Sequence, residues 1–88
     1  MNEKQLRKHY QTVFTQAIGK MIDRQVDGYD GNSTDFLKSM NEADIQDLAS
    51  VSKMKAIRIK NTNNPDTQED NALDIINYMV AIVGRLYG

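Results

Sequence analysis

The chain contains no cysteine and only one histidine among its 88 residues. Without cysteine, disulfide bonds, thiolate nucleophiles, iron–sulfur clusters and thiolate zinc sites are excluded. His9 alone cannot form a histidine-rich metal site. Any metal bound by this chain therefore needs oxygen ligands, which favours magnesium, manganese or calcium.

Neither sign of charge dominates, and no long apolar run is present. The 11 Lys and Arg residues against 12 Asp and Glu residues leave a net charge of −1, which argues against nonspecific binding to nucleic acid or anionic membranes. The most apolar stretch, residues 73–86, is interrupted by Asp74, Asn77 and Arg85 and cannot span a bilayer. No basic-then-apolar leader follows Met1. We expect a cytoplasmic protein with neither a membrane nor a nucleic-acid partner.

The small size of the chain limits its core. We expect one helical domain over residues 1–88, because this length leaves no room for a second core. A chain of this size buries only about 60–65% of its unfolded surface, and no disulfide can supplement that core. The sequence therefore predicts a homo-oligomer.

Apolar residues at helical spacing predict an amphipathic helix from Asn2 to about Asp27, with its apolar face in the core. That face consists of Leu6, Tyr10, Val13, Phe14, Ala17, Ile18, Met21 and Ile22. The glycines and local hydrogen-bonding side chains of residues 27–33 end the helix. They form a turn or a ligand-facing loop, and Ser33 or Thr34 is expected to cap a short turn through Met40.

A second helix is predicted from about Glu42 to Lys60, with Asn41 as its N-cap, acidic residues at its start and basic residues at its end. Its apolar residues lie on two sides, so it is expected to contact two partners. These are either neighbouring helices or a second subunit, and the pattern does not separate the two.

A third helix is predicted after the turn-rich connection 61–65, capped by Asp66 or Thr67. Half of its circumference is apolar and is expected to lie in the core. The other half is a polar strip made of Asp70, Asp74, Asn77, Tyr78, Ala81 and Arg85. The fold expected from these segments is all-α, with three main helices forming a small bundle that oligomerisation completes.

Asp70, Asp74 and Asn77 follow one ridge of this third helix at positions i, i+4 and i+7. Mg²⁺ takes one or two protein carboxylates and completes its octahedron with water and phosphate oxygens, so the two aspartates suffice for a Mg²⁺–nucleotide site. The alternative is the ordinary polar side of an amphipathic helix, with acidic residues that favour the helix dipole.

Lys53 and Arg58 are the basic residues that we expect to face phosphates. The alternative is that they only complement the negative end of the second helix's dipole. The sequence contains no Gly-x-x-x-x-Gly-Lys-Ser/Thr loop, no Gly-x-Gly-x-x-Gly loop and no Gly-x-Ser-x-Gly elbow. Kinase-like and hydrolase-triad functions are therefore not predicted.

Three separated stretches, Tyr29–Ser33, Ser52–Asn61 and Glu69–Tyr78, resemble the small nucleotide-modification-associated domains of phage and bacterial proteins. That family looks related to the MazG-like, all-α NTP pyrophosphohydrolases. Matched by position, its motif residues are the acidic pair Asp70 and Asp74, the basic pair Lys53 and Arg58, and the Asn-Tyr pair Asn77 and Tyr78. The resemblance implies an oligomeric helical bundle that binds a nucleotide and Mg²⁺, in a host cytoplasm if the protein is phage-encoded.

Two departures from the MazG-like pattern bear on activity. Asn71 stands where the later motif has glutamate, and the preceding helix lacks Glu-x-x-Glu. We expect a nucleotide-handling protein in which a metal-activated water attacks a phosphoanhydride if turnover occurs. The alternative is a non-enzymatic, phage-type protein that inhibits a host protein or sequesters a nucleotide signal.

Overall fold

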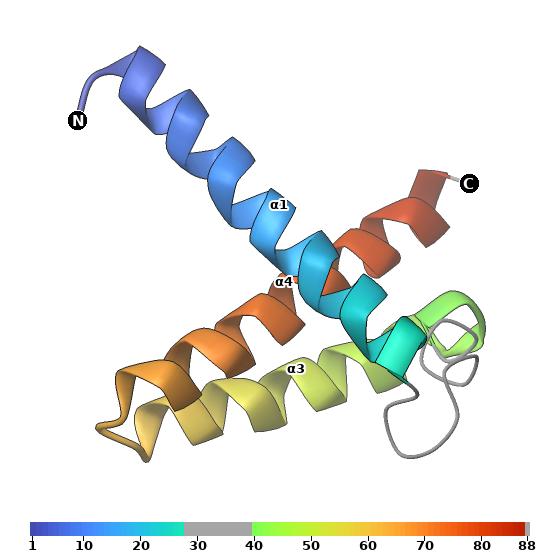
Figure 1. Cartoon of the computed structure of the whole chain (residues 1–88). Helices are drawn as coiled ribbons and strands as arrows, with labels where there is room; N and C mark the ends of the chain where they lie inside the picture. The colour runs from blue at the N-terminus through green and yellow to red at the C-terminus, as the bar shows by residue number, and fades with distance from the viewer. Residues whose placement is uncertain (28–39, 88) are drawn as a thin grey trace.

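The computed structural model describes residues 1–27 and 40–87 of the chain. These residues form the helices α1 (Glu3–Asp27), α3 (Ile45–Lys60) and α4 (Pro65–Tyr87), with no strand in the described ranges (Figure 1). The all-α class predicted from the sequence is confirmed. The expected loop at Gly28–Ser33 and the capped turn before Met40 lie outside the described residues.

The first helix begins with a reciprocal cap. The Asn2 side chain accepts a hydrogen bond from the Gln5 amide at 2.9 Å, and the Gln5 side chain accepts one from the Asn2 amide at the same distance. Together these bonds satisfy two amides that a helix N-terminus leaves without intrahelical partners. The predicted helix from Asn2 to about Asp27 is confirmed to within one residue.

The predicted start of the second helix at Glu42, with Asn41 as its cap, is wrong. Residues 40–42 are helical, but α3 begins only at Ile45, after Asp44. Arg85 of α4 lies at this interruption, where its guanidinium donates hydrogen bonds to the main-chain carbonyls of Met40 and Ala43. The chain between the two helical segments is thereby tied to the end of α4.

The start of α4 also differs from the expectation. Asn64 is the cap, since its side-chain oxygen accepts from the amides of Asp66 at 2.9 Å and Thr67 at 3.3 Å. Pro65 occupies the first helical position, where its missing N–H costs no intrahelical bond. The prediction that Asp66 or Thr67 caps this helix is therefore wrong, because the cap lies two residues before Asp66. The Gln68 side chain donates to the Thr62 carbonyl at 3.0 Å and so fixes the short connection from α3.

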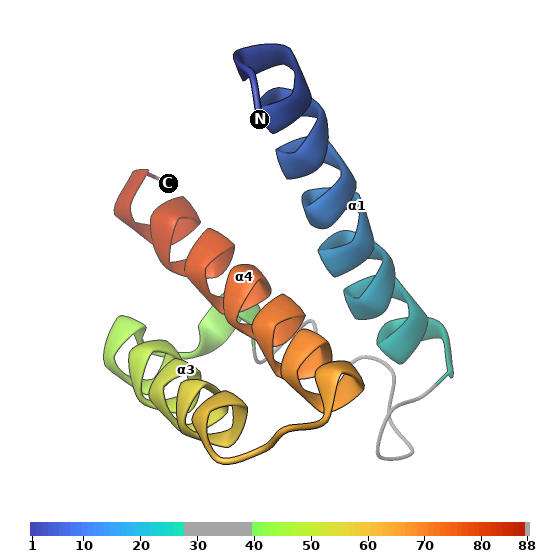
Figure 2. The same ribbon diagram turned by 90° about the vertical axis from the view of Figure 1, so that its left-hand side faces the viewer.

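The helix α4 lies between the other two. It runs antiparallel to α3, to which it is joined by the connection 61–64, and α1 crosses it (Figures 1 and 2). The crossing point is marked by the Asn77 side chain, which donates to the Ala17 carbonyl of α1 at 2.9 Å. Beyond this point the N-terminal half of α1 projects away from α3 and α4 (Figure 1).

The burial of α4 differs from the expectation for its apolar half. Its polar strip faces the other helices, where Asn71, Asp74 and Asn77 are buried. Much of its apolar half is exposed instead, at Met79, Val80, Val83 and Leu86. The apolar face of α1 is also largely exposed, and the buried apolar residues among those described are Ala17, Met40 and Leu48. Within one chain, the prediction that the apolar faces form the core is therefore wrong.

None of the helices in the described ranges combines the length and the apolar character needed to cross a bilayer. This agrees with the expectation that the segment 73–86 does not span a membrane.

Candidate functional site

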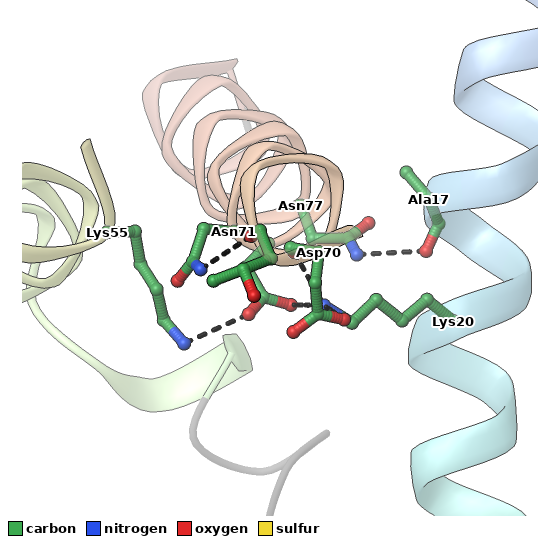
Figure 3. Close-up of polar contacts among 8 residues, drawn as sticks. Ala17, Lys20, Lys55, Asp70, Asn71 and Asn77 are labelled. Atoms are coloured by element: carbon green, nitrogen blue, oxygen red, sulfur yellow. Dashed lines mark hydrogen bonds and ion pairs between the residues drawn. The ribbon is translucent and has the colours of Figure 1, made fainter. Parts of the chain in front are cut away.

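Asp74 is the most deeply buried large side chain of the described residues, with 1% of its surface exposed. Two lysines from different helices reach it. The Lys20 ammonium of α1 lies 2.8 Å from Oδ1, and the Lys55 ammonium of α3 lies 3.0 Å from Oδ2. Figure 3 shows these lysines approaching α4 from opposite sides. One carboxylate thus joins all three helices.

Asp70 lies one turn before Asp74 on the same ridge of α4. The Lys20 ammonium lies 2.5 Å from its Oδ1 and donates to its main-chain carbonyl at 2.6 Å. Unlike Asp74, the Asp70 side chain is 59% exposed. Lys20 therefore links a buried carboxylate to one that solvent and solutes can reach. We refer to Lys20, Lys55, Asp70 and Asp74 as the Lys–Asp cluster.

Two buried asparagines flank the cluster on α4. The Asn71 side chain donates to the Thr67 carbonyl of its own helix at 2.8 Å, whereas Asn77 donates to Ala17 of α1. Both are visible in Figure 3. Both bonds give a buried amide its partner, and that of Asn77 also ties α4 to α1.

The cluster contains two ammonium groups and two carboxylates, so its formal charge is zero. A buried carboxylate is costly unless it is paired, and here each oxygen of Asp74 has its own lysine. The Lys20 and Lys55 side chains keep 14% and 18% of their surface exposed. The arrangement therefore holds two cationic donors in fixed positions near the surface, and phosphate oxygens are suitable acceptors for such donors.

The structure brings only some of the predicted site residues together. Asp70 and Asp74 lie in the cluster, and Asn77 lies one turn further along α4. Tyr78 is half-buried on the same helix. Lys53 and Arg58, the predicted phosphate-facing residues, are exposed on α3, and no contact with Asp70 or Asp74 is found for them among the described residues.

Lys20 and Lys55 are not among the site residues predicted from the sequence. Both lysines follow small residues of a buried face at helical spacing, since Lys20 is three residues after Ala17 and Lys55 three residues after Ser52. A lysine on the contact face of a helix is unusual because lysine is almost never fully buried unless it is paired. The position of each lysine on a contact face is therefore the feature of the sequence that could have identified it as a site residue.

Mg²⁺ binding by Asp70 and Asp74 stays a prediction. In residues 1–27 and 40–87, no three histidine, cysteine, aspartate or glutamate side chains come together as a metal site. Both oxygens of Asp74 also lie within 3.0 Å of a lysine ammonium. The cluster as it stands does not fit a lone cation, because a cation at Asp74 would have to displace ammonium groups.

The resemblance inferred from the three sequence stretches finds no support in other proteins. No family model matches the chain, and neither a curated protein nor a solved structure matches it. Membership of the nucleotide-modification-associated family therefore stays a prediction.

Proposed function

We propose that this protein is a cytoplasmic, homo-oligomeric nucleotide-binding protein that holds the phosphates of its ligand at the Lys–Asp cluster. The observation that carries the proposal is the convergence of Lys20 and Lys55, from α1 and α3, on the buried carboxylate of Asp74. Phosphate oxygens are strong acceptors for such donors. The nucleotide part of the proposal depends on the resemblance.

The neutral cluster suits a phosphate chain that arrives together with a cation. A phosphate group that accepts from Lys20 competes with Asp70 for that ammonium, so the Asp70 carboxylate becomes available as an oxygen ligand, while the buried Asp74 keeps its lysines. Asp70 is the accessible one of the two carboxylates, since its side chain is 59% exposed. Mg²⁺, when bound with the ligand, supplies charge neutralisation of the phosphates. We therefore expect Mg²⁺ and phosphate to bind together and Mg²⁺ alone to bind weakly.

The proposal covers binding and not turnover. A MazG-like pyrophosphohydrolase carries glutamates that this chain lacks, and Asn71, at the position of one of them, uses its amide to bond the Thr67 carbonyl. Pyrophosphate release is therefore measured as a separate quantity. Release that depends on Mg²⁺ and is lost in Asp74→Asn would extend the function to hydrolysis.

Isothermal titration with a panel of nucleoside triphosphates and inorganic triphosphate, each with and without Mg²⁺, tests the proposal. Lys55→Gln and Lys53→Gln form a matched pair on α3, because the first residue reaches Asp74 and the second is exposed. We expect Lys55→Gln to weaken binding roughly 10-fold or more, as for loss of one charge-assisted hydrogen bond, and Lys53→Gln to change it less than about 2-fold.

Two outcomes of this titration would contradict the proposal. One is the absence of heat with every ligand in the panel at millimolar concentration. The other is an equal loss of affinity in Lys53→Gln and Lys55→Gln, because that result would assign the phosphates to the exposed side of α3. Circular dichroism of both variants establishes that a loss of binding is not a loss of helix.

A second function is favoured by a different feature, the exposed apolar residues Val51, Met54 and Ile57 of α3. They suit a non-enzymatic protein that binds a protein target, such as a host factor if the chain is phage-encoded. A stoichiometric partner that is retained by Asp74→Ala and lost in Met54→Glu would support this function over nucleotide binding.

A further inference from the structure

An apolar stripe runs along α1 on its exposed side. Its members follow one another at every fourth position and are each between 43% and 54% exposed: Leu6, Tyr10, Phe14, Ile18 and Ile22. Tyr10 and Phe14 stack on each other, with ring centroids 6.2 Å apart. The N-terminal part of the stripe lies on the half of α1 that projects beyond α4 (Figure 1). Scattered single apolar residues need no explanation, but a continuous stripe of this length does.

The stripe continues across a groove onto α4. The groove has a volume of about 390 Å³ and lies between Phe14 and Ile18 of α1 and Ile76 and Val80 of α4. On its far side, Val80 and Val83 are 56% and 51% exposed. The stripe, the groove and these two valines form one apolar face, which we call the α1–α4 face.

We infer that the α1–α4 face is the contact between two copies of this chain, with the two α1 helices antiparallel about a two-fold axis near Phe14. The stripe is symmetric about that residue, with two large apolar side chains on each side. An antiparallel arrangement therefore sets Tyr10 of one copy against Ile18 of the other. A two-fold interface requires such self-complementarity.

The exposed area of the α1–α4 face is close to what a contact with a second copy of the chain requires. The five side chains of the stripe and the two valines, seven in all, expose roughly 600 Å² in each copy, if a fully exposed side chain of this size contributes about 175 Å². Stable interfaces bury about 800 Å² for each partner. The ridge of every fourth residue also favours one geometry, because two such ridges pack with the helix axes crossing at about −50°.

Sedimentation equilibrium at about 100 μM tests the inference. We expect a mass near twice the 10.0 kDa of the chain. Ile18→Asp should weaken the dimer roughly 100-fold by forcing a charge into the contact, whereas Gln16→Asp should leave it unchanged. Gln16 is the matched control because it is exposed and lies about 160° around α1 from Ile18. A monomeric wild type, or a dimer that Ile18→Asp leaves intact, would overturn the inference.

A second measurement covers the case in which Ile18→Asp loses its fold. Because the natural chain has no cysteine, Phe14→Cys and Gln16→Cys each carry a single thiol. Mild oxidation should link Phe14→Cys into a covalent dimer within minutes, since the two sulfurs lie near the axis, and should link Gln16→Cys much more slowly. Equal rates for the two variants, or an assembly larger than a dimer with neither thiol reactive, would also overturn the inference.

Discussion

The Asn77 side chain donates a 2.9 Å hydrogen bond to the main-chain carbonyl of Ala17, which lies 60 residues earlier in the chain. Three residues beyond Ala17, Lys20 lies 2.8 Å from Asp74, which is three residues before Asn77. Two polar contacts one helical turn apart therefore fix the position of α1 on α4. Polar groups therefore contribute directly to the contact between these helices, and several apolar residues beside it are exposed.

The first prediction concerns this hydrogen bond. Asn77→Ala removes the donor to the buried Ala17 carbonyl, so we expect a loss of about 1–2 kcal/mol in the free energy of unfolding. The loss should be concentrated in α1, because the bond joins α1 to α4. Urea denaturation at a fixed protein concentration measures the total, and amide hydrogen exchange locates it.

Asn71→Ala is the matched control, since Asn71 is buried like Asn77 but bonds the Thr67 carbonyl within α4. It removes the same side chain from the same helix. Exchange in α1 should therefore stay near the wild-type rate in Asn71→Ala. If the two variants accelerated exchange in α1 equally, the bond to Ala17 would not be what holds the helix in place.

The second prediction concerns the charge of Asp74. Asp74→Asn leaves Lys55 without its carboxylate and Lys20 with only that of Asp70, so we expect a loss of about 3 kcal/mol in the free energy of unfolding. Because Asp74 is 1% exposed, screening by salt is weak and the loss should persist at high ionic strength. Urea denaturation of the variant at low and high salt measures both effects.

Asp70→Asn gives the comparison for this prediction. Its side chain is 59% exposed, so its ion pair with Lys20 is worth less than about 1 kcal/mol. The two variants make the same chemical change one turn apart on α4. Equal losses of stability would show that burial does not distinguish the two carboxylates.

The helices and the polar strip of α4 could be predicted from the sequence because they depend on local spacing. Apolar residues at helical positions predict α1, α3 and α4, and Asp70 and Asp74 are correctly placed on one ridge. Spacing alone left two orientations of that ridge open, one facing other helices and one facing solvent. Periodicity tells which residues share a face, but it does not tell which face meets another helix.

The cations of the cluster were harder to predict for the same reason. Lys20 and Lys55 come from α1 and α3, and only the packing of both helices on α4 brings them to one carboxylate. Lys53 and Arg58 belong to the same basic end of α3 as Lys55 but remain exposed. The usual rule places the apolar face of a helix in the core. That rule fails for α4, because its buried contacts include polar residues while several of its apolar residues are exposed.

The third prediction tests the start of α4. Asn64→Ala removes the side-chain oxygen that accepts from the amides of Asp66 and Thr67, and loss of an N-cap costs about 1 kcal/mol in the free energy of unfolding. Asn63→Ala, one residue earlier and exposed, should change it by less than about 0.5 kcal/mol. Thermal denaturation followed by circular dichroism compares the two variants. If Asn64→Ala lowered the free energy of unfolding less than Asn63→Ala does, Asn64 would not be the cap, and Asp66 or Thr67 would again be the candidates.

The fourth prediction concerns Gly19, which lies inside α1 where an added methyl group meets no atom within 4 Å. Alanine loses less backbone entropy on folding than glycine, so Gly19→Ala should raise the free energy of unfolding by about 0.5–1 kcal/mol. Gly84 has the same open surroundings but lies in the last turn of α4, where fewer intrahelical bonds depend on it, so Gly84→Ala should gain less. Urea denaturation at one protein concentration measures both.

Gly19→Ala also probes the proposed dimer. Position 19 lies about 140° around α1 from Phe14, next to which the two-fold axis is placed, and about 60° from Ile22 at the end of the stripe. Its stabilisation should therefore leave the dissociation constant of the dimer unchanged. A variant that gains helix stability but dissociates more readily would mean that the neighbouring copy covers the Gly19 side of α1, and the two-fold axis would then have to be moved away from Phe14.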